Sequence, residues 1–189
     1  MIKNAIFSIF IIGLFAASAV TGQVTPPTGM IGWWAGDGDF RDSSGNGLNA
    51  TPASGASPTF LVGKVGQGFT TPGTQYATIP DSPALRPQSF TIEGWARLSN
   101  ADGNTKVFFA KPLGASFFDS FALFAAGATL RGAVCNNTGC ITLTAPITIN
   151  AWHHIAFSYD DPGGAATKTA RLYLNGAVVA TDTTGGAIG

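Results

Sequence analysis

Charged residues are scarce in this 189-residue sequence, in which Lys, Arg, Asp and Glu together make up 11% and the formal net charge is zero. Partners such as nucleic acid or an acidic membrane surface require clustered positive charge, so we expect neither. Helices with a solvated face need charged straight-chain residues, whereas this chain has 25 Gly, 14 Phe and many Thr and Ser. We therefore expect an all-β protein. With 45% hydrophobic residues, the chain can build one well-buried core.

Long apolar runs are confined to the N-terminus. A short basic start precedes an apolar run over residues 5–15, and small residues in an A-x-A arrangement follow it. This order is typical of a secretory signal peptide, which we predict at residues 1–19, with cleavage after Gly22 as the alternative. The run is shorter than the ~20 residues of a spanning helix, although a retained membrane anchor is the other interpretation. Residues 20–30 are a Pro-containing leader, and the mature chain is expected to be secreted or at the cell surface.

Cysteine occurs only twice, as Cys135 and Cys140. The four residues between them, Asn-Asn-Thr-Gly, have the composition of a tight turn. In an exported chain this spacing predicts a disulfide across a hairpin loop. So short a loop constrains the unfolded state by only ~2 kcal/mol, so we expect a local staple. Two cysteines without a nearby histidine do not supply the ligands of a structural zinc site.

Helical periodicity is not sustained anywhere after the N-terminal run. Short strand patterns recur instead, separated by Gly, Pro, Asn and Asp. The predicted strands cover residues 75–80, 89–98, 106–111, 121–126, 129–134, 141–145, 152–160 and 169–174. This pattern is typical of an antiparallel jelly-roll sandwich. Asn175 and Gly176 lie between two apolar runs and predict a type I′ hairpin turn.

Histidine also occurs only twice, at the adjacent positions His153 and His154. Side chains alternate along a strand, so His153 shares one face with Ile155 and Phe157, while His154 shares the other with Trp152. Two histidines that point apart cannot chelate one ion together from a regular strand. We interpret one as lying near the sheet edge and one as hydrogen-bonded within the sandwich.

The order of several motifs resembles that of a known family. The segments DFRDSSGNG, GKVGQGF, SFTIEGWARL, WHHIAFSYD and LYLNGAVV follow one another along the chain. Together they resemble the laminin-G-like jelly-roll domains of the concanavalin A-like lectin and glucanase superfamily, from about Ile31 to the last residue. The resemblance implies one sandwich domain over residues 31–189. It also implies that the tryptophan strand at 152–160 and the Asn-Gly hairpin are framework elements.

Members of this family usually continue with two more strands, the second of which contains a G-x-I-D-[ED] segment that closes the sheet. This sequence ends at TTGGAIG instead. A sheet without its closing strand exposes backbone donors and apolar residues. We therefore expect the sandwich to be incomplete at its C-terminus and to be part of a longer secreted protein. A closing strand supplied by another chain is the alternative.

Paired catalytic carboxylates are missing from the central strands. Retaining glucanases of the superfamily use two carboxyl groups about 5 Å apart, carried by an E-x-D-x-x-E motif. The nearest candidate here is Glu93, but the positions two and four residues after it hold Trp95 and Arg97. Ser158 lies near His154 in sequence, yet no G-x-S-x-G elbow is present to form a nucleophile. We therefore predict no catalytic residues and no enzymatic activity.

Aromatic and polar side chains alternate with apolar ones in the segment SFTIEGWARL. Its even-numbered apolar residues suit the core, whereas Glu93, Trp95 and Arg97 share the opposite face, and Trp152 and His154 form a second set of this kind. If both sets lie on one sheet face, they form a groove in which a sugar ring stacks on an indole while polar groups hold its hydroxyls. Because tryptophan is usually buried, the alternative is a second small core beneath a covering loop, with Arg97 and Glu93 as a same-face pair.

Three aspartates concentrate oxygen ligands in a Gly-rich loop. They are Asp37, Asp39 and Asp42, and several members of the superfamily bind a structural or ligand-bridging calcium. Arg41 has the wrong charge for the fifth position of an EF-hand-like loop, and the bidentate Glu is missing. Turn formation by Asp and Asn explains the same residues. Calcium is the candidate cofactor, and these three carboxylates are its candidate ligands.

The resemblance and the residues together favour binding over catalysis. The first hypothesis is a non-catalytic secreted or cell-surface recognition module, whose partner is a glycan or an extracellular protein. The alternatives are a structural or spacer domain of a larger extracellular protein and an accessory domain of a glycoside hydrolase.

Overall fold

The computed structural model describes residues 26–112, 120–136, 139–163 and 167–183. The chain divides into two units, Met1–Met30 and Ile31–Gly189, and the strands belong to the second. The signal peptide predicted at 1–19 and most of the leader lie outside the described residues. Within the described part, no helix has the length and apolar character needed to cross a membrane.

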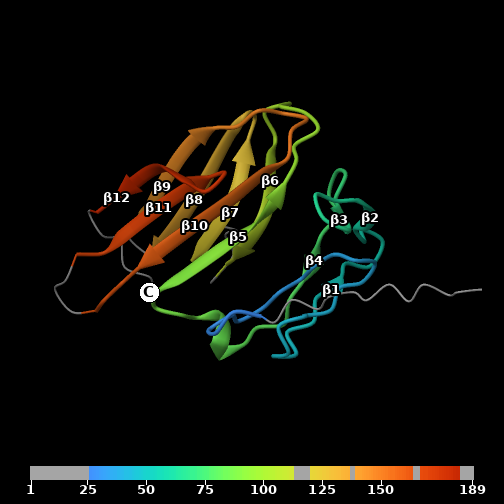
Figure 1. Ribbon diagram of the computed structural model, residues 1–189, viewed down its shortest axis with the longest axis horizontal. Helices are drawn as coiled ribbons and strands as arrows, with labels where there is room; N and C mark the ends of the chain where they lie inside the picture. Colours follow the sequence, from blue (N-terminus) through green and yellow to red (C-terminus); the bar gives the residue numbers. More distant parts are fainter. Residues whose placement is uncertain (1–25, 113–119, 137–138, 164–166, 184–189) are drawn as a thin grey trace, which may run out of the picture. The chain divides into compact units, whose positions relative to one another are not determined.

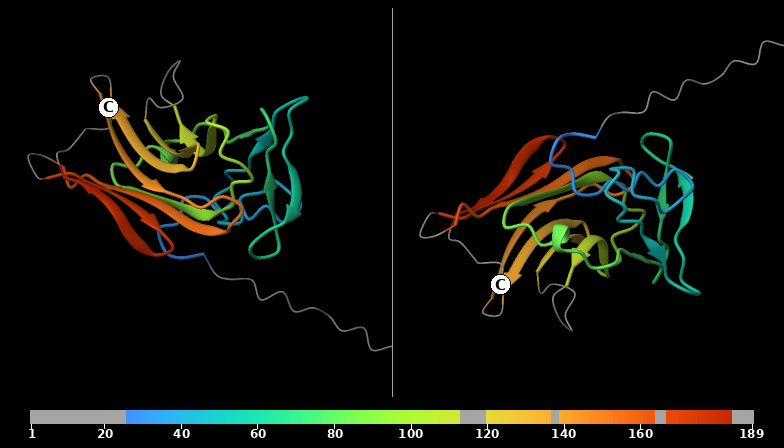
Figure 2. Two further views of the ribbon diagram at one scale, coloured as in Figure 1. Left: turned by 90° about the horizontal axis from the view of Figure 1, so that it is seen from above. Right: turned by 90° about the horizontal axis from the view of Figure 1, so that it is seen from below.

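Two four-stranded antiparallel sheets build the sandwich. The first has the order β12-β11-β10-β5 and consists of β5 (Phe90–Ala96), β10 (His153–Asp160), β11 (Thr169–Leu174) and β12 (Ala177–Asp182). The second has the order β6-β7-β8-β9 and consists of β6 (Thr105–Lys111), β7 (Phe121–Ala126), β8 (Thr129–Asn136) and β9 (Gly139–Pro146). Figure 1 shows the strands of each sheet side by side, and Figure 2 shows the sheets as two layers.

Two short antiparallel pairs precede the sandwich in the chain. They are β1 (Thr51–Pro52) with β4 (Ala77–Thr78), and β2 (Thr59–Val62) with β3 (Gln67–Thr70). The 3-10 turn η1 (Pro83–Leu85) is the only helical segment in the part of the chain that the structure describes. The predicted jelly-roll sandwich, all-β and antiparallel, is therefore confirmed.

Alternation along the strands places the core between the two sheets. In β10 the side chains of His153, Ile155, Phe157 and Tyr159 are buried, as their shared parity predicts. Leu130, Val134 and other inward residues of the second sheet meet them in one apolar cluster. Removal of this apolar area from water is the main term that stabilises the sandwich.

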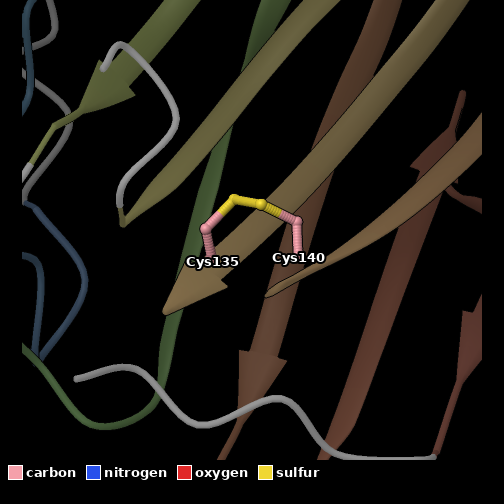
Figure 3. Close-up of a disulfide and its surroundings, with 2 residues drawn as sticks. All are labelled: Cys135 and Cys140. Atoms are coloured by element: carbon pink, nitrogen blue, oxygen red, sulfur yellow. A yellow bond between two sulfur atoms is a disulfide. The ribbon is translucent and has the colours of Figure 1, made fainter. Parts of the chain in front are cut away.

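Two local predictions are confirmed by the backbone. Asn175 and Gly176 have φ values of 52° and 81°, the two positive angles that a type I′ turn requires between β11 and β12. Cys135 and Cys140 face each other in the register of β8 and β9 and form a disulfide, which Figure 3 shows.

The strand predicted at residues 75–80 is much shorter in the structure. Only Ala77 and Thr78 pair as β4, because Tyr76 is already engaged in a loop: its N–H donates to the carbonyl of Ala56 and its carbonyl accepts from Ala53. Pro80 has no N–H to extend the ladder. The hairpin of β2 and β3, which the strand patterns did not predict, lies just before this segment.

Candidate ligand-binding face

The outward side of the sheet β12-β11-β10-β5 carries the residues that the sequence selected. We call this side the outer face. Its members on β5, β10 and β11, or next to the ends of these strands, point away from the core; they are Thr91, Glu93, Trp95, Arg97, Trp152, His154, Ala156, Ser158, Arg171 and Tyr173. The predicted alternation of β5 and β10 is therefore confirmed.

Trp95 is the most prominent aromatic residue of this face. It pairs in register with His154, and the two rings meet edge to face with centroids 5.4 Å apart. The side chain of Trp95 is 48% exposed, so it is not buried beneath a covering loop. Its indole presents an accessible plane of the kind on which sugar rings stack.

A hydrogen-bonding side chain flanks each tryptophan. Glu93 lies two residues before Trp95 on the same face, and its carboxylate is 3.8 Å from Nε2 of His154. The guanidinium of Arg97 lies over the ring of Trp152, 5.5 Å from its centroid. Glu93 therefore faces His154, and Arg97 faces Trp152, in place of the Glu93–Arg97 pair that was the alternative in the sequence.

Lys64 reaches the same surface from the turn between β2 and β3. Its ammonium nitrogen is 5.2 Å from the ring centroid of Trp95, within the range of a cation–π contact. Sequence reasoning missed this residue, because the contact depends on where the hairpin lies in the fold. Arg171 and Tyr173 were missed as well, although the alternation in TARLYL places both on the outward side of β11.

The middle of the outer face is formed by small side chains. Ala156 pairs with Glu93 on one side and with Tyr173 on the other, and it is nearly buried between its neighbours. An aromatic ring and a carboxylate thus flank a methyl group. The face combines aromatic rings, cations and one central carboxylate.

His153 has a structural place on the opposite side of β10. It is buried, its Nε2 lies 3.1 Å from the carbonyl oxygen of Thr148, and the side-chain amide of Asn175 lies 3.2 Å from Nδ1. These contacts correspond to donation from Nε2–H and acceptance at Nδ1. The prediction of one histidine hydrogen-bonded within the sandwich is confirmed, whereas His154 lies on β10 between β11 and β5 and not on an edge strand of the sheet.

The aspartate loop uses its carboxylates to organise the backbone. Oδ1 of Asp42 accepts from the N–H groups of Trp33 and Ser44, both at 2.9 Å, and Oδ2 accepts from Leu48 N–H at 3.0 Å. Partial burial alone would raise the pKa of Asp42, but hydrogen bonds from Ser44, Trp33 and Leu48 outweigh it and lower this pKa. The carboxylate of Asp42 therefore holds three backbone positions of the loop together.

The other two aspartates are held separately. Asp37 accepts from Gln67 N–H at 2.7 Å, and Asp39 accepts from Arg41 N–H at 3.0 Å. Residues 26–112, 120–136, 139–163 and 167–183 contain no group of three or more His, Cys, Asp or Glu side chains that could hold a metal ion. The donor set seen here does not fit calcium without rearrangement, and calcium binding at these carboxylates stays a prediction.

Calcium binding by the loop would be visible as stabilisation of the folded chain. Millimolar calcium is expected to raise the thermal unfolding midpoint, since a ligand that binds only the folded state stabilises it. The double substitution Asp37→Asn and Asp39→Asn should abolish the rise. Differential scanning fluorimetry, with magnesium as the control cation, measures this effect. An unfolding midpoint that calcium leaves unchanged would contradict calcium binding by the loop.

A comparison of the chain with protein-family models finds a match. A laminin G family model, described as the concanavalin A-like lectin/glucanases superfamily, matches residues 71–189. The chain belongs to this superfamily. The resemblance seen in the sequence is confirmed, and the matched part holds β4 to β12, whereas β1, β2 and β3 precede it. A search of curated proteins finds no match.

Solved structures share the fold at low sequence identity. The chain is similar to the binding domain of Paraclostridial Mosquitocidal Protein 1, with a TM-score of 0.61, 15% identity, and coverage of 81% of this chain and 39% of that one. It is also similar to a structure that concerns cell entry of botulinum neurotoxin type C, described as dependent on interaction with two ganglioside molecules. There the TM-score is 0.50 and the identity 14%, with coverage of 77% and 36%. The chain thus spans less than half of each, and these likenesses show the fold alone.

Proposed function

We propose that this chain is a non-catalytic, extracellular recognition module that binds glycans through the outer face. The observation that carries the proposal is the half-exposed indole of Trp95, bordered by His154 and followed, just beyond the end of β5, by Arg97. A sugar ring stacks on an exposed indole, while charged and hydrogen-bonding side chains around it hold hydroxyl groups. Trp152 with Arg97 extends the same surface.

An extracellular location is supported by two features. The chain carries a disulfide between Cys135 and Cys140, a bond that persists in oxidising compartments. The N-terminal run has the order of a secretory signal peptide. Both agree with a role outside the cytoplasm.

A binding role is favoured over hydrolysis by the chemistry of the outer face. Retaining glycoside hydrolysis needs two carboxyl groups about 5 Å apart. Glu93 faces the imidazole of His154; the next outward position of its strand is Trp95, and Arg97 follows just after the strand ends. The ganglioside dependence described for the botulinum neurotoxin type C structure supports a glycan as the class of ligand.

Removal of the Trp95 indole is expected to weaken glycan binding by about fivefold to a hundredfold, since stacking of a flat ring on an aromatic side chain contributes on the order of 1–3 kcal/mol. The measurement is a glycan array followed by calorimetry on the best oligosaccharide, with the whole chain and with Trp95→Ala. Tyr76→Ala is the matched control, because Tyr76 is an exposed aromatic outside this sheet. If no oligosaccharide binds, or if both variants bind alike, the proposal is wrong and a structural role is favoured.

A further inference from the structure

The cations at the outer face differ from most others in the chain. Elsewhere, ion pairs with aspartates are formed by Arg41, Arg86, Lys106, Lys111 and Lys168. Four cations in the described part of the chain form no ion pair with a carboxylate. Three of them belong to the outer face, namely Lys64, Arg97 and Arg171, and the fourth, Arg131, lies on the other sheet. Cations without a carboxylate partner thus gather at the outer face.

Two of these cations lie directly over the tryptophans. Nζ of Lys64 lies over Trp95, 5.2 Å from the ring centroid. Cζ of Arg97 lies over Trp152, 5.5 Å from the ring centroid. An exposed cation–π contact is worth only about 0.5–1 kcal/mol and leaves the charge unneutralised. Each indole therefore has a positive group over one side of its ring, and that charge can still pair with an anion.

Two carboxylates, Glu93 and Asp160, belong to the same face. Glu93 lies 3.8 Å from Nε2 of His154. Asp160, at the far end of β10, accepts a hydrogen bond from the hydroxyl of Ser89. At the two tryptophan rings themselves, Lys64 and Arg97 thus outnumber the one neighbouring carboxylate of the face, Glu93, although the whole chain has no net charge.

We infer that the ligand of the outer face is an anionic glycan, and that Lys64 and Arg97 select its carboxylate or sulfate group. The inference rests on the proposed function, because it names the class of glycan bound at the same surface. A sugar ring on Trp95 brings its acidic substituent within reach of Lys64, and a neighbouring unit on Trp152 meets Arg97. Lys64 lies in the turn between β2 and β3, before the residues 71–189 that the family model matches, whereas Arg97 lies within them.

The test compares one oligosaccharide in neutral, sialylated and sulfated forms by calorimetry with the whole chain. The acidic forms are expected to bind about tenfold more tightly than the neutral form in low salt, since two exposed ion pairs of up to about 1 kcal/mol each contribute. The difference should shrink as salt rises, because exposed charges are screened. Preference for one acidic form identifies whether carboxylate or sulfate is the recognised group.

The substitutions separate charge from stacking. Lys64→Gln is expected to lower affinity for the acidic form by roughly threefold to fivefold, and Lys64→Gln with Arg97→Gln by about tenfold, in each case by a larger factor than for the neutral form. Lys106→Gln is the control, since that lysine pairs with Asp102 away from the tryptophans. Unfolding midpoints of all variants show whether the fold is retained.

The outcomes distinguish this inference from the proposed function. If neutral and acidic forms bind equally and both depend on Trp95, the anionic selectivity is wrong while glycan binding stands. If polyglutamate binds as tightly as the acidic saccharide, the face recognises charge alone, and the inference is overturned. If no saccharide binds, the inference and the proposed function fail together.

Discussion

Replacing Phe157 with alanine is expected to lower the free energy of unfolding by about 3–5 kcal/mol, the usual cost of deleting a fully buried aromatic ring. Phe157 is 0% exposed and lies in the middle of β10, in the cluster between the two sheets. Its ring centroid lies 6.1 Å from that of Phe90. Urea unfolding followed by tryptophan fluorescence measures the change.

The partner of this ring on the other sheet is a glycine. A Cβ built on Gly132 of β8 would lie 2.3 Å from Cδ2 of Phe157, closer than any real contact. Gly132→Ala is therefore expected to cost about 1–3 kcal/mol through overpacking. In the Phe157→Ala background the same substitution should cost much less, because the added methyl group then fills the cavity.

Gly94 on β5 is the matched control for Gly132. A Cβ built there meets nothing within 4 Å, so Gly94→Ala is expected to change the free energy of unfolding by less than about 0.5 kcal/mol. Equal costs for the two glycine substitutions, or a cost of Gly132→Ala that is unchanged without the Phe157 ring, would contradict the packing described here.

Asp42→Asn is expected to lower the free energy of unfolding by about 1–3 kcal/mol at neutral pH, because one amide cannot replace a carboxylate that accepts three backbone N–H groups. Asp39→Asn is the control, since Asp39 is exposed and its contacts in the described residues, a hydrogen bond from the N–H of Arg41 and an ion pair with the same residue, lie at the surface. Its effect should stay within about 0.5 kcal/mol.

The effect of Asp42 should depend on pH with a definite sign. Its pKa is lowered in the folded chain from the ordinary value of 3.8, so the unfolded chain binds the proton more readily. The stabilisation is therefore fully present above the ordinary pKa and is lost as pH falls through the lowered pKa. Wild type and Asp42→Asn should converge in stability at acidic pH, as measured by unfolding midpoints from neutral pH downward. If the difference in stability between wild type and Asp42→Asn stayed constant as pH falls, the negative charge of Asp42 would not be the source of the stabilisation.

Much of the sandwich could be predicted from short-range patterns. The strand pattern at 121–126 coincides with β7, and that at 169–174 with β11, because period-2 alternation and flanking turn residues specify where such strands begin and end. The Asn175-Gly176 turn and the Cys135–Cys140 bridge were predictable for the same reason. Each depends on residues only a few positions apart, which the chain keeps close in any compact state.

Short strands held by tertiary contacts were harder to predict. β2 and β3 are four residues each, and the rings of Phe60 and Phe69 both pack against Phe40 from a preceding loop. Residues 75–80 alternate like a strand, yet loop hydrogen bonds to Ala53 and Ala56 leave only two of them in the ladder. In so short a strand, tertiary contacts outweigh the local strand propensity, because few residues contribute to that propensity.

The sequence by itself determined the all-β class, the superfamily, and the parity that turns Glu93, Trp95, Arg97 and His154 away from the core. These follow from composition and from alternation, which are properties of neighbours in the chain. Only the tertiary structure decided that Trp95 remains half exposed, that Arg97 lies over Trp152 and Glu93 faces His154, and that Lys64 reaches the same surface. Residues 31 positions apart meet there because the fold places a hairpin turn beside a sheet face, and no local pattern encodes that distance.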